Sequence, residues 1–242
     1  MNPPPAERVA LVTGGSGALG GAIVRRLRRD GCAVAFTYRE GREPAEKLAA
    51  ETGAAAFRAD LTSAAEVKAA VAGALDRFGR VDVLVNNAGR TQVMPFALIE
   101  EQDWDEILAA NLKSMFLTTR EVVRGMIARR SGVIVNIGSL AGHRMLEVPV
   151  HYATAKAGVS GFTLALAKEL ARYGIRVNSV VPGLLEGGVG RLVPEKELAD
   201  YARHCAAGRP GRAAEVAEVV AFVASEAAGY LNGQNVFVDG GL

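Results

Sequence analysis

Tyr152 and Lys156, in the stretch HYATAKAG (151–158), have the spacing in this sequence that most directly suggests proton chemistry. Residues four apart share one face of a helix, so the phenol and the ammonium can lie close together. A phenol has a pKa of about 10, and a neighbouring positive charge lowers that pKa by stabilising the phenolate. The pair is therefore a plausible proton donor to a carbonyl oxygen. The alternative is a surface coincidence, because many pairs with this spacing do no chemistry.

The glycine-rich stretch TGGSGALGGAI, which begins at Thr13, suggests a phosphate site. Gly15, Gly17 and Gly20 form the pattern G-x-G-x-x-G between an apolar strand candidate and a helix candidate. Glycines allow a tight turn and let the backbone approach a pyrophosphate, and the free N–H groups of a helix start attract its charge. This context favours a dinucleotide over the alternative of a glycine-rich turn without a ligand.

The end of the second strand candidate, FTYRE (36–40), bears on which nicotinamide dinucleotide is bound. An acidic residue at this place binds the ribose 2′-hydroxyl of NAD, whereas an arginine accommodates the 2′-phosphate of NADP. The guanidinium of Arg39 can pair with that phosphate in a forked geometry, which predicts NADP(H). In the alternative, Arg39 is a solvated loop cation and Glu40 points inward to bind NAD.

These residues need a scaffold, and the sequence pattern predicts an α/β fold. Short apolar runs rich in β-branched residues alternate with helical patterns, which indicates a parallel sheet covered on both faces. We expect one Rossmann-like, doubly wound sheet of about seven strands with helices on both faces. The predicted strands are 8–13, 33–38, 55–59, 81–86, 132–138, 175–181 and 235–239, and the predicted helices are 18–29, 43–51, 63–78, 103–128, 152–172 and 212–225.

Length and composition set the remaining expectations. The chain has 242 residues, half of them apolar, which fits a single domain over 1–242, and the stretch 184–210 breaks the alternation and predicts a mobile substrate lid. A net charge of +2 gives no reason to expect a nucleic acid, and the two cysteines form no metal pattern. Without an apolar leader or a spanning apolar run, we expect a cytoplasmic protein that binds neither membrane nor metal.

Eight motifs, in order along the whole chain, carry a family resemblance. They are TGGSGALG at 13–20, DL at 60–61, NNAG at 86–89, Asn111 in NLKSMF, Ser139 in NIGSLAG, the pair Tyr152 and Lys156, PG at 182–183, and GQNVFVDGG at 233–241. The sequence resembles short-chain dehydrogenases/reductases. No single motif is specific for that family, but together they are. The alternative for NNAG alone is a turn that ends a strand and stabilises the sheet.

The resemblance implies catalytic roles for four residues. Tyr152 corresponds to the general acid that protonates the carbonyl oxygen, and Ser139 to the hydroxyl that orients the same oxygen. Lys156 would lower the pKa of Tyr152 and bind the ribose of the nicotinamide, and Asn111 would hold a water that links Lys156 to solvent. The helix of Tyr152 commonly packs across a subunit interface in this family, which implies a homotetramer. His143 and His151 are interpreted as ordinary loop histidines.

The resemblance also implies a cofactor site for NADP(H). Asp60 would bind the adenine amine, and the N–H of Leu61 would meet its ring. Two positions depart from the family pattern: Ala18 replaces a glycine of the phosphate turn, and Gly187 replaces a threonine that binds the carboxamide. The cofactor-binding residues implied are Gly14, Gly15, Ser16, Gly17, Ala18, Leu19, Gly20, Tyr38, Arg39, Asp60, Leu61, Asn87, Ala88, Gly89, Tyr152, Lys156, Pro182, Gly183 and Leu185.

Within the family, the stretches 86–116 and 232–242 are most similar to 3-oxoacyl-(acyl-carrier-protein) reductases. That similarity implies reduction of a 3-oxoacyl thioester by NADPH, in fatty-acid or polyketide synthesis, on an acyl carrier protein as partner. Arg129, Arg130 and Arg172 would then dock the acidic carrier near the site mouth, although they can equally be helix C-terminal cations facing the macrodipole. The alternatives are an acetoacetyl-coenzyme A reductase, a dehydrogenase of another alcohol, sugar or steroid, and a cofactor-binding regulator without turnover.

Overall fold

The sheet of this protein is parallel throughout and has seven strands. In the computed structural model, which describes residues 7–188, 193 and 195–242, the strand order is β3-β2-β1-β4-β5-β6-β7. The strands are β1 (Val9–Val12), β2 (Ala33–Tyr38), β3 (Ala55–Arg58), β4 (Val83–Asn86), β5 (Gly132–Ile137), β6 (Ile175–Pro182) and β7 (Asn235–Val238). The predicted α/β fold with a doubly wound sheet in a single domain is thus confirmed.

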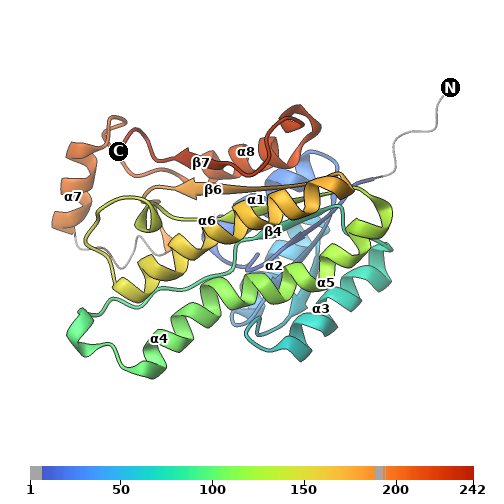
Figure 1. Cartoon of the computed structure of the whole chain (residues 1–242), viewed down its shortest axis with the longest axis horizontal. Helices are drawn as coiled ribbons and strands as arrows, with labels where there is room; N and C mark the ends of the chain where they lie inside the picture. The colour runs from blue at the N-terminus through green and yellow to red at the C-terminus, as the bar shows by residue number, and fades with distance from the viewer. Residues whose placement is uncertain (1–6, 189–192, 194) are drawn as a thin grey trace.

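Helices cover both faces of the sheet (Figure 1). The longer ones are α1 (Ala18–Arg29), α2 (Arg42–Thr52), α3 (Ala64–Phe78), α4 (Glu101–Leu108), α5 (Ser114–Arg129), α6 (Val150–Leu170), α7 (Glu195–His204) and α8 (Ala213–Ala224). Buried side chains of α1, α2 and α8 form one core layer with the sheet, and those of α3, α5 and α6 form the other. Short 3-10 turns lie at Phe96–Leu98, Leu140–Gly142, Ala171–Tyr173 and Glu226–Ala228.

Successive strand residues supply the two core layers alternately, as a sheet covered on both faces requires. In β1, Val12 packs with α1 and α8, while Leu11 packs with α3 and α5. In β2, the fully buried Phe36 belongs to the first layer. Burial of a side chain of this size contributes about 1.5–3 kcal/mol, and here it also gives the loop after β1 a fixed floor.

The strand order places a crevice at the carboxyl edge of the sheet. β1 pairs with β2 on one side and with β4 on the other, so the chain winds outward from β1 in two directions. Ligands of doubly wound sheets bind where this reversal occurs. The loops after β1, β2, β4, β5 and β6 all emerge at that edge.

The predicted single helix 103–128 differs from what the structure contains. Helix α4 runs into a π-helical turn, η2 (Ala109–Lys113), and then into α5. A π-turn shifts the hydrogen-bond pattern by one residue and often occurs at functional sites. Here the turn contains Asn111, one of the four residues with an implied catalytic role.

The predicted lid, 184–210, contains a helix. This helix is α7, and it buries no side chain of its own. Residues 189–192 and 194 of the predicted lid lie outside the described residues, and the mobility of the lid stays a prediction. No helix in the described part of the chain is long and apolar enough to cross a bilayer.

Candidate active site

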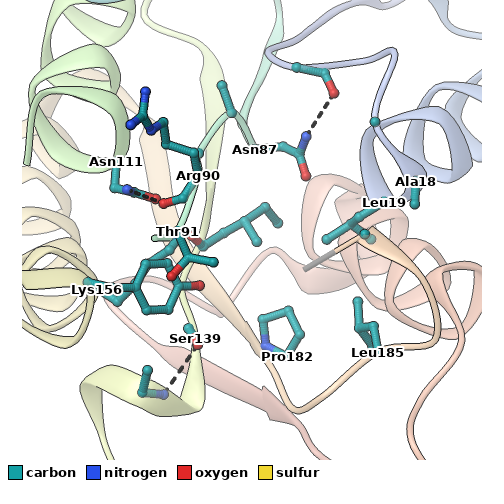
Figure 2. A pocket seen from close by; sticks show the side chains of 18 of the residues that line it. Ala18, Leu19, Asn87, Arg90, Thr91, Asn111, Ser139, Lys156, Pro182 and Leu185 are labelled. Atoms are coloured by element: carbon teal, nitrogen blue, oxygen red, sulfur yellow. Dashed lines mark hydrogen bonds between the residues drawn. The ribbon is translucent and has the colours of Figure 1, made fainter. Parts of the chain in front are cut away.

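A pocket of about 980 Å³ opens at the carboxyl edge of the sheet. Every residue with an implied catalytic or cofactor role lines it except Gly15. Figure 2 shows the pocket from close by, with Ala18 and Leu19 of the glycine turn on one side and Asn111, Lys156 and Ser139 on the other. The sequence therefore predicted residues that the fold brings into one cavity.

The glycine turn is compact because its carbonyl and amide groups are committed to neighbouring strands. The N–H of Gly14, whose φ is +66°, donates to the hydroxyl of Thr37 at 3.2 Å. A side chain on Gly15 would come within 2.6 Å of the Phe36 ring, and one on Gly20 within 2.2 Å of the Gly14 carbonyl. Gly15 therefore lies beneath the turn, packed against the Phe36 ring. It does not line the pocket, and its contact with the cofactor stays a prediction.

Thr13 and Asn87 fix the position of this turn, and sequence analysis assigned no role to Thr13. The Thr13 hydroxyl accepts hydrogen bonds from the N–H groups of Asn87 and Ala88 at 2.9 and 3.0 Å. The side-chain amide of Asn87 donates to the Thr13 carbonyl at 2.9 Å and to the Gly14 carbonyl at 3.2 Å. Hydrogen bonds therefore connect the residues that follow β1 with those that follow β4. The NNAG motif stabilises the glycine turn and also lines the pocket.

Ala18, which replaces a family glycine, begins α1 at the pocket surface. Its methyl group is exposed, and the position that a Cβ on Gly188 would occupy lies 3.8 Å from it. Gly187 and Gly188 have φ values of +80° and +54°. A threonine at 187 would be strained in this left-handed conformation. The two departures from the family pattern thus lie on facing segments of one wall.

The far end of the pocket carries opposite charges at the ends of β2 and β3. The Arg39 guanidinium lies 2.9 Å from the Glu40 carboxylate, and both side chains are exposed. Asp60 accepts hydrogen bonds from the N–H and the hydroxyl of Thr62, which are the main reason that its pKa is lowered, and the positive charge of Arg39 adds to the effect. Asp60 is therefore held as an acceptor at the place where the resemblance puts the adenine.

Helix α6 and the end of β5 together position the proton-transfer residues. Tyr152 and Lys156 lie one turn apart on α6, and the Lys156 ammonium lies 5.8 Å from the centre of the Tyr152 ring. That ammonium donates a hydrogen bond to the carbonyl of Ile137, the last residue of β5, at 3.0 Å. Ser139 follows β5 by two residues and also lines the pocket. The spacing of the pair on one helix face is as predicted.

The pKa values of this pair correct one expectation from the sequence. Burial raises the pKa of Tyr152, and its interaction with the Ser139 hydroxyl opposes the rise. Burial also lowers the pKa of Lys156 from 10.5 to about 8. The expected lowering of the Tyr152 pKa by Lys156 is therefore not found, because desolvation of the phenol is the larger effect.

Asn111 combines a fixed donor with a free acceptor. Its amide nitrogen donates to the carbonyl groups of Ile107 at 2.9 Å and Arg90 at 2.7 Å, as Figure 2 shows for Arg90. Its buried Oδ1 has no hydrogen-bond partner within the described residues. A Cβ on Gly89 would lie 2.5 Å from this oxygen and 3.6 Å from the Lys156 ammonium. Such an orphaned acceptor near Lys156 fits the water-holding role implied by the resemblance.

The two histidines assigned to loops differ from each other. His143 Nε2 lies 2.9 Å from the Ser160 hydroxyl, and its ring packs edge-on against Phe237. The prediction that His151 is a loop residue is wrong, because His151 belongs to α6. It is fully buried, and neither ring nitrogen has a partner among the described side chains. Burial lowers the pKa of both. Neither histidine lines the pocket.

The three arginines assigned to carrier docking lie at the opposite edge of the sheet from the pocket. Arg130 ends α5 just before β5 begins, has a φ of +52°, and donates to the Arg172 carbonyl at 2.7 Å. Arg129 donates to the Val81 carbonyl at 2.6 Å. Ser139 is at the other end of β5, and six strand residues span about 20 Å. In this chain the three cations lie away from the mouth of its own pocket, and their role in carrier docking stays a prediction.

Several features of the cavity fit a nicotinamide dinucleotide. The glycine turn lines the pocket where α1 begins, and its tight path needs glycine, because a Cβ on Gly20 would lie 2.2 Å from the Gly14 carbonyl and one on Gly14 would lie 3.0 Å from the Ala88 backbone. Asp60 offers an acceptor at one end, and Ser139, Tyr152 and Lys156 lie at the other. Because these groups lie along one cavity, a hydride donor bound in it can meet a carbonyl group beside Tyr152.

Comparison with known proteins agrees with this geometry. A family model described as enoyl-(acyl carrier protein) reductase matches residues 15–242. The 3-oxoacyl-(acyl-carrier-protein) reductase FabG of Vibrio cholerae is 36% identical over 97% of both chains, and the acetoacetyl-CoA reductase of Shinella zoogloeoides is 39% identical over 97% of this chain and 98% of its own.

A solved structure gives the same result for the fold. A double mutant of a short-chain dehydrogenase/reductase from Serratia marcescens is 34% identical, covers 98% of each chain, and superposes with a TM-score of 0.91. The ordered motifs, the seven-stranded sheet and the full-length relatives lead to one conclusion. The chain belongs to the short-chain dehydrogenase/reductase family, and the 3-oxoacyl-(acyl-carrier-protein) reductases named FabG are among its full-length relatives.

Proposed function

We propose that this protein reduces a 3-oxoacyl thioester, carried by an acyl carrier protein, to the 3-hydroxyacyl thioester with NADPH. The observation that carries the proposal is the placement of Ser139, Tyr152 and Lys156 at one end of a pocket whose other end is a glycine turn. Relatives named for this reaction, at 36% identity over nearly the whole chain, support it. Fatty-acid or polyketide synthesis in the cytoplasm would then be its setting.

The chain's own residues account for the proton half of the reaction. When bound, the cofactor supplies a hydride to the carbonyl carbon. The raised pKa of Tyr152 keeps its phenol protonated at neutral pH, so a proton is available for the carbonyl oxygen. Ser139 donates a hydrogen bond to the same oxygen and orients it. Lys156 stabilises the phenolate left behind, and a water held by Asn111 leads a new proton toward this pair.

The preference for NADP(H) rests on Arg39. Its guanidinium lies at the pocket rim and already pairs with an exposed carboxylate, that of Glu40. A dianionic 2′-phosphate competes well for such a guanidinium, because a forked pair with phosphate is stronger than an exposed pair with one carboxylate. NAD binding through Glu40 is the alternative.

We also propose a homotetramer, supported by apolar side chains exposed on two separate surfaces. Phe116 of α5 and Leu164 of α6 are 46% and 53% exposed, and Phe222 of α8 and Phe237 of β7 are 47% and 39% exposed. Exposed apolar groups of this size are typical of contact surfaces. Two surfaces, each self-complementary, generate a tetramer with two kinds of interface.

A second candidate function is reduction of acetoacetyl-coenzyme A. It is favoured by the relative of that name and by the absence, among the described residues, of the three predicted docking arginines from the pocket mouth. Both candidates are tested by following NADPH oxidation with acetoacetyl-carrier protein and with acetoacetyl-coenzyme A. Higher kcat/KM for the carrier-bound substrate supports the proposal. Higher kcat/KM for the coenzyme A ester favours the second candidate, and no turnover of either contradicts both.

A further inference from the structure

The loop that follows β6 forms the pocket wall to which the resemblance assigns the nicotinamide end. Its two ends are held by backbone hydrogen bonds: the Gly183 N–H donates to the Val238 carbonyl at 3.0 Å, and the Glu186 N–H to the Gly211 carbonyl at 2.8 Å. Leu185 is paired with Gly211 in a single parallel bridge, so its own peptide groups point away from that partner. Small shifts of this loop therefore change which groups the wall offers to a ligand.

The middle of the loop is held by Tyr201, which comes from α7 and has no assigned role so far. Its hydroxyl accepts a hydrogen bond from the Leu184 N–H at 3.1 Å and donates one to the Asp239 carbonyl at 3.2 Å. A Cβ on Gly183 would lie 2.3 Å from the same hydroxyl oxygen. Position 183 in the Pro-Gly motif therefore needs glycine because a side chain there would collide with the Tyr201 hydroxyl. A positive φ is not the reason, since Gly183 has none.

The end of α7 is tied to the tail after β7 as well. The N–H of Ala207 donates to the Gly240 carbonyl at 2.9 Å, and the N–H of Ala206 to the Gly241 carbonyl at 3.4 Å. The buried Cys205 thiol lies 3.3 Å from the Gly240 carbonyl. Figure 1 shows the C-terminal tail close to α7. Helix, tail and loop therefore form one hydrogen-bonded unit at the pocket wall.

Tyr201 links the position of α7 to the pocket wall. Helix α7 buries no side chain, so apolar packing contributes little to its position, and directed hydrogen bonds matter more than usual. Both hydrogen-bonding functions of the hydroxyl are used, and both partners are backbone groups outside α7. Tyr201 also lines the pocket, and part of its surface is exposed there.

We propose that Tyr201 is a positioning residue for the nicotinamide end of the cofactor. By holding Leu184 against Asp239, it sets the peptide groups of the loop after β6 in the orientation that receives the carboxamide. It acts through the backbone and makes no contact with the reacting atoms. This inference rests on the proposed use of a nicotinamide cofactor, but it does not depend on the identity of the ketone.

Tyr201→Phe tests the proposal because it removes the hydroxyl and keeps the ring. Two ligands are titrated by calorimetry: NADP+, and 2′,5′-ADP, which has the adenosine end without the nicotinamide. Since one hydrogen bond is lost at the loop, we expect the Kd of NADP+ to rise about threefold to tenfold. The Kd of 2′,5′-ADP should change by less than about twofold. Tyr230→Phe, at a fully exposed tyrosine, is the matched control and should change neither.

Equal weakening of both ligands, or weakening of neither, would overturn the proposal. Hydrogen–deuterium exchange of the wild-type protein tests it without a variant: NADP+ should protect segments 183–188 and 199–205 together, and 2′,5′-ADP should protect neither. Protection of 183–188 alone contradicts a link through Tyr201. If the wild type binds NAD+ but not NADP+, the proposed cofactor preference fails. The Tyr201 comparison is then made with NAD+ and ADP-ribose.

Discussion

At the scale of single residues, the phenol of Tyr152 decides whether the proposed proton transfer exists. We predict that Tyr152→Phe lowers kcat about 100-fold to 10,000-fold, because a positioned general acid contributes that much. The ring stays, so the melting temperature and the Kd for NADPH should stay close to the wild-type values. Steady-state kinetics, thermal unfolding and cofactor titration measure the three quantities. Tyr173→Phe, outside the pocket, is the control, and a Tyr152→Phe enzyme with normal turnover would contradict the mechanism.

Lys156 gives a second residue-scale prediction, which concerns stability. Burial lowers its pKa to about 8 in the folded protein, whereas the unfolded chain keeps the ordinary value of 10.5. Between these two values the unfolded chain binds a proton that the folded chain has lost, so the free energy of unfolding rises with pH. Below pH 8 both states are protonated, and the dependence disappears.

The Lys156→Met variant lacks this titration and serves as the reference. We expect the unfolding free energy of the wild type, minus that of Lys156→Met, to rise by up to about 3 kcal/mol from pH 8 to pH 10.5. Urea unfolding of both proteins across this window measures the difference, and other titrating groups cancel because both proteins carry them. A difference that stays flat, or that falls with pH, would show that the Lys156 pKa is not lowered by burial.

At the scale of elements, the end of β2 carries Arg39, on which the proposed cofactor preference rests. The exposed pair of Arg39 with Glu40 contributes little to stability, so Arg39 is free to bind a phosphate at small cost. We predict that Arg39→Ala raises the Kd of NADPH roughly tenfold and leaves that of NADH nearly unchanged. Fluorescence titration with both cofactors measures this. Arg25→Ala, which breaks an exposed pair with Glu51 outside the pocket, is the control. An equal effect on the two cofactors would exclude recognition of the 2′-phosphate by Arg39.

The sequence predicted the helices and strands better than it predicted the details of the site, and the elements also show where sequence-based prediction fails. The strand candidates agree with the observed strands to within two residues at each end, because apolar β-branched runs between glycines leave few other choices. The π-turn around Asn111 was not predicted, since a hydrogen bond shifted by one residue leaves the apolar periodicity almost intact. Thr13 and Tyr201 were missed because their partners lie far away in the sequence. The Tyr152 pKa was misjudged because it depends on burial, which spacing does not report.

At the scale of the whole molecule, the docking arginines are a strand's length away from the pocket of their own chain. Arg130 precedes β5, and Ser139 follows it, so about 20 Å of strand separates them. If the acidic carrier protein does bind at Arg130 and Arg172, we expect it to serve the pocket of a neighbouring subunit of the proposed homotetramer. Within one chain, these residues serve instead as caps of helix ends, through the hydrogen bond of Arg130 to the Arg172 carbonyl.

Mixed oligomers test docking between subunits. We expect Arg130→Glu with Arg172→Glu to raise KM for an acetoacetyl-carrier protein several-fold and to leave KM for a small free thioester unchanged. Added salt should have the same effect on the wild type, because exposed charges are screened over about 10 Å at 0.1 M ionic strength. Tyr152→Phe subunits keep the arginines but lack the proton donor, so co-expressing them with the double-charge variant should restore part of the carrier-dependent activity. One parent has a raised KM for the carrier-bound substrate and the other has little turnover. A mixed oligomer whose KM for the carrier-bound substrate does not fall below that of the charge variant, or an equal change in KM for both substrates, would leave these arginines with a structural role only.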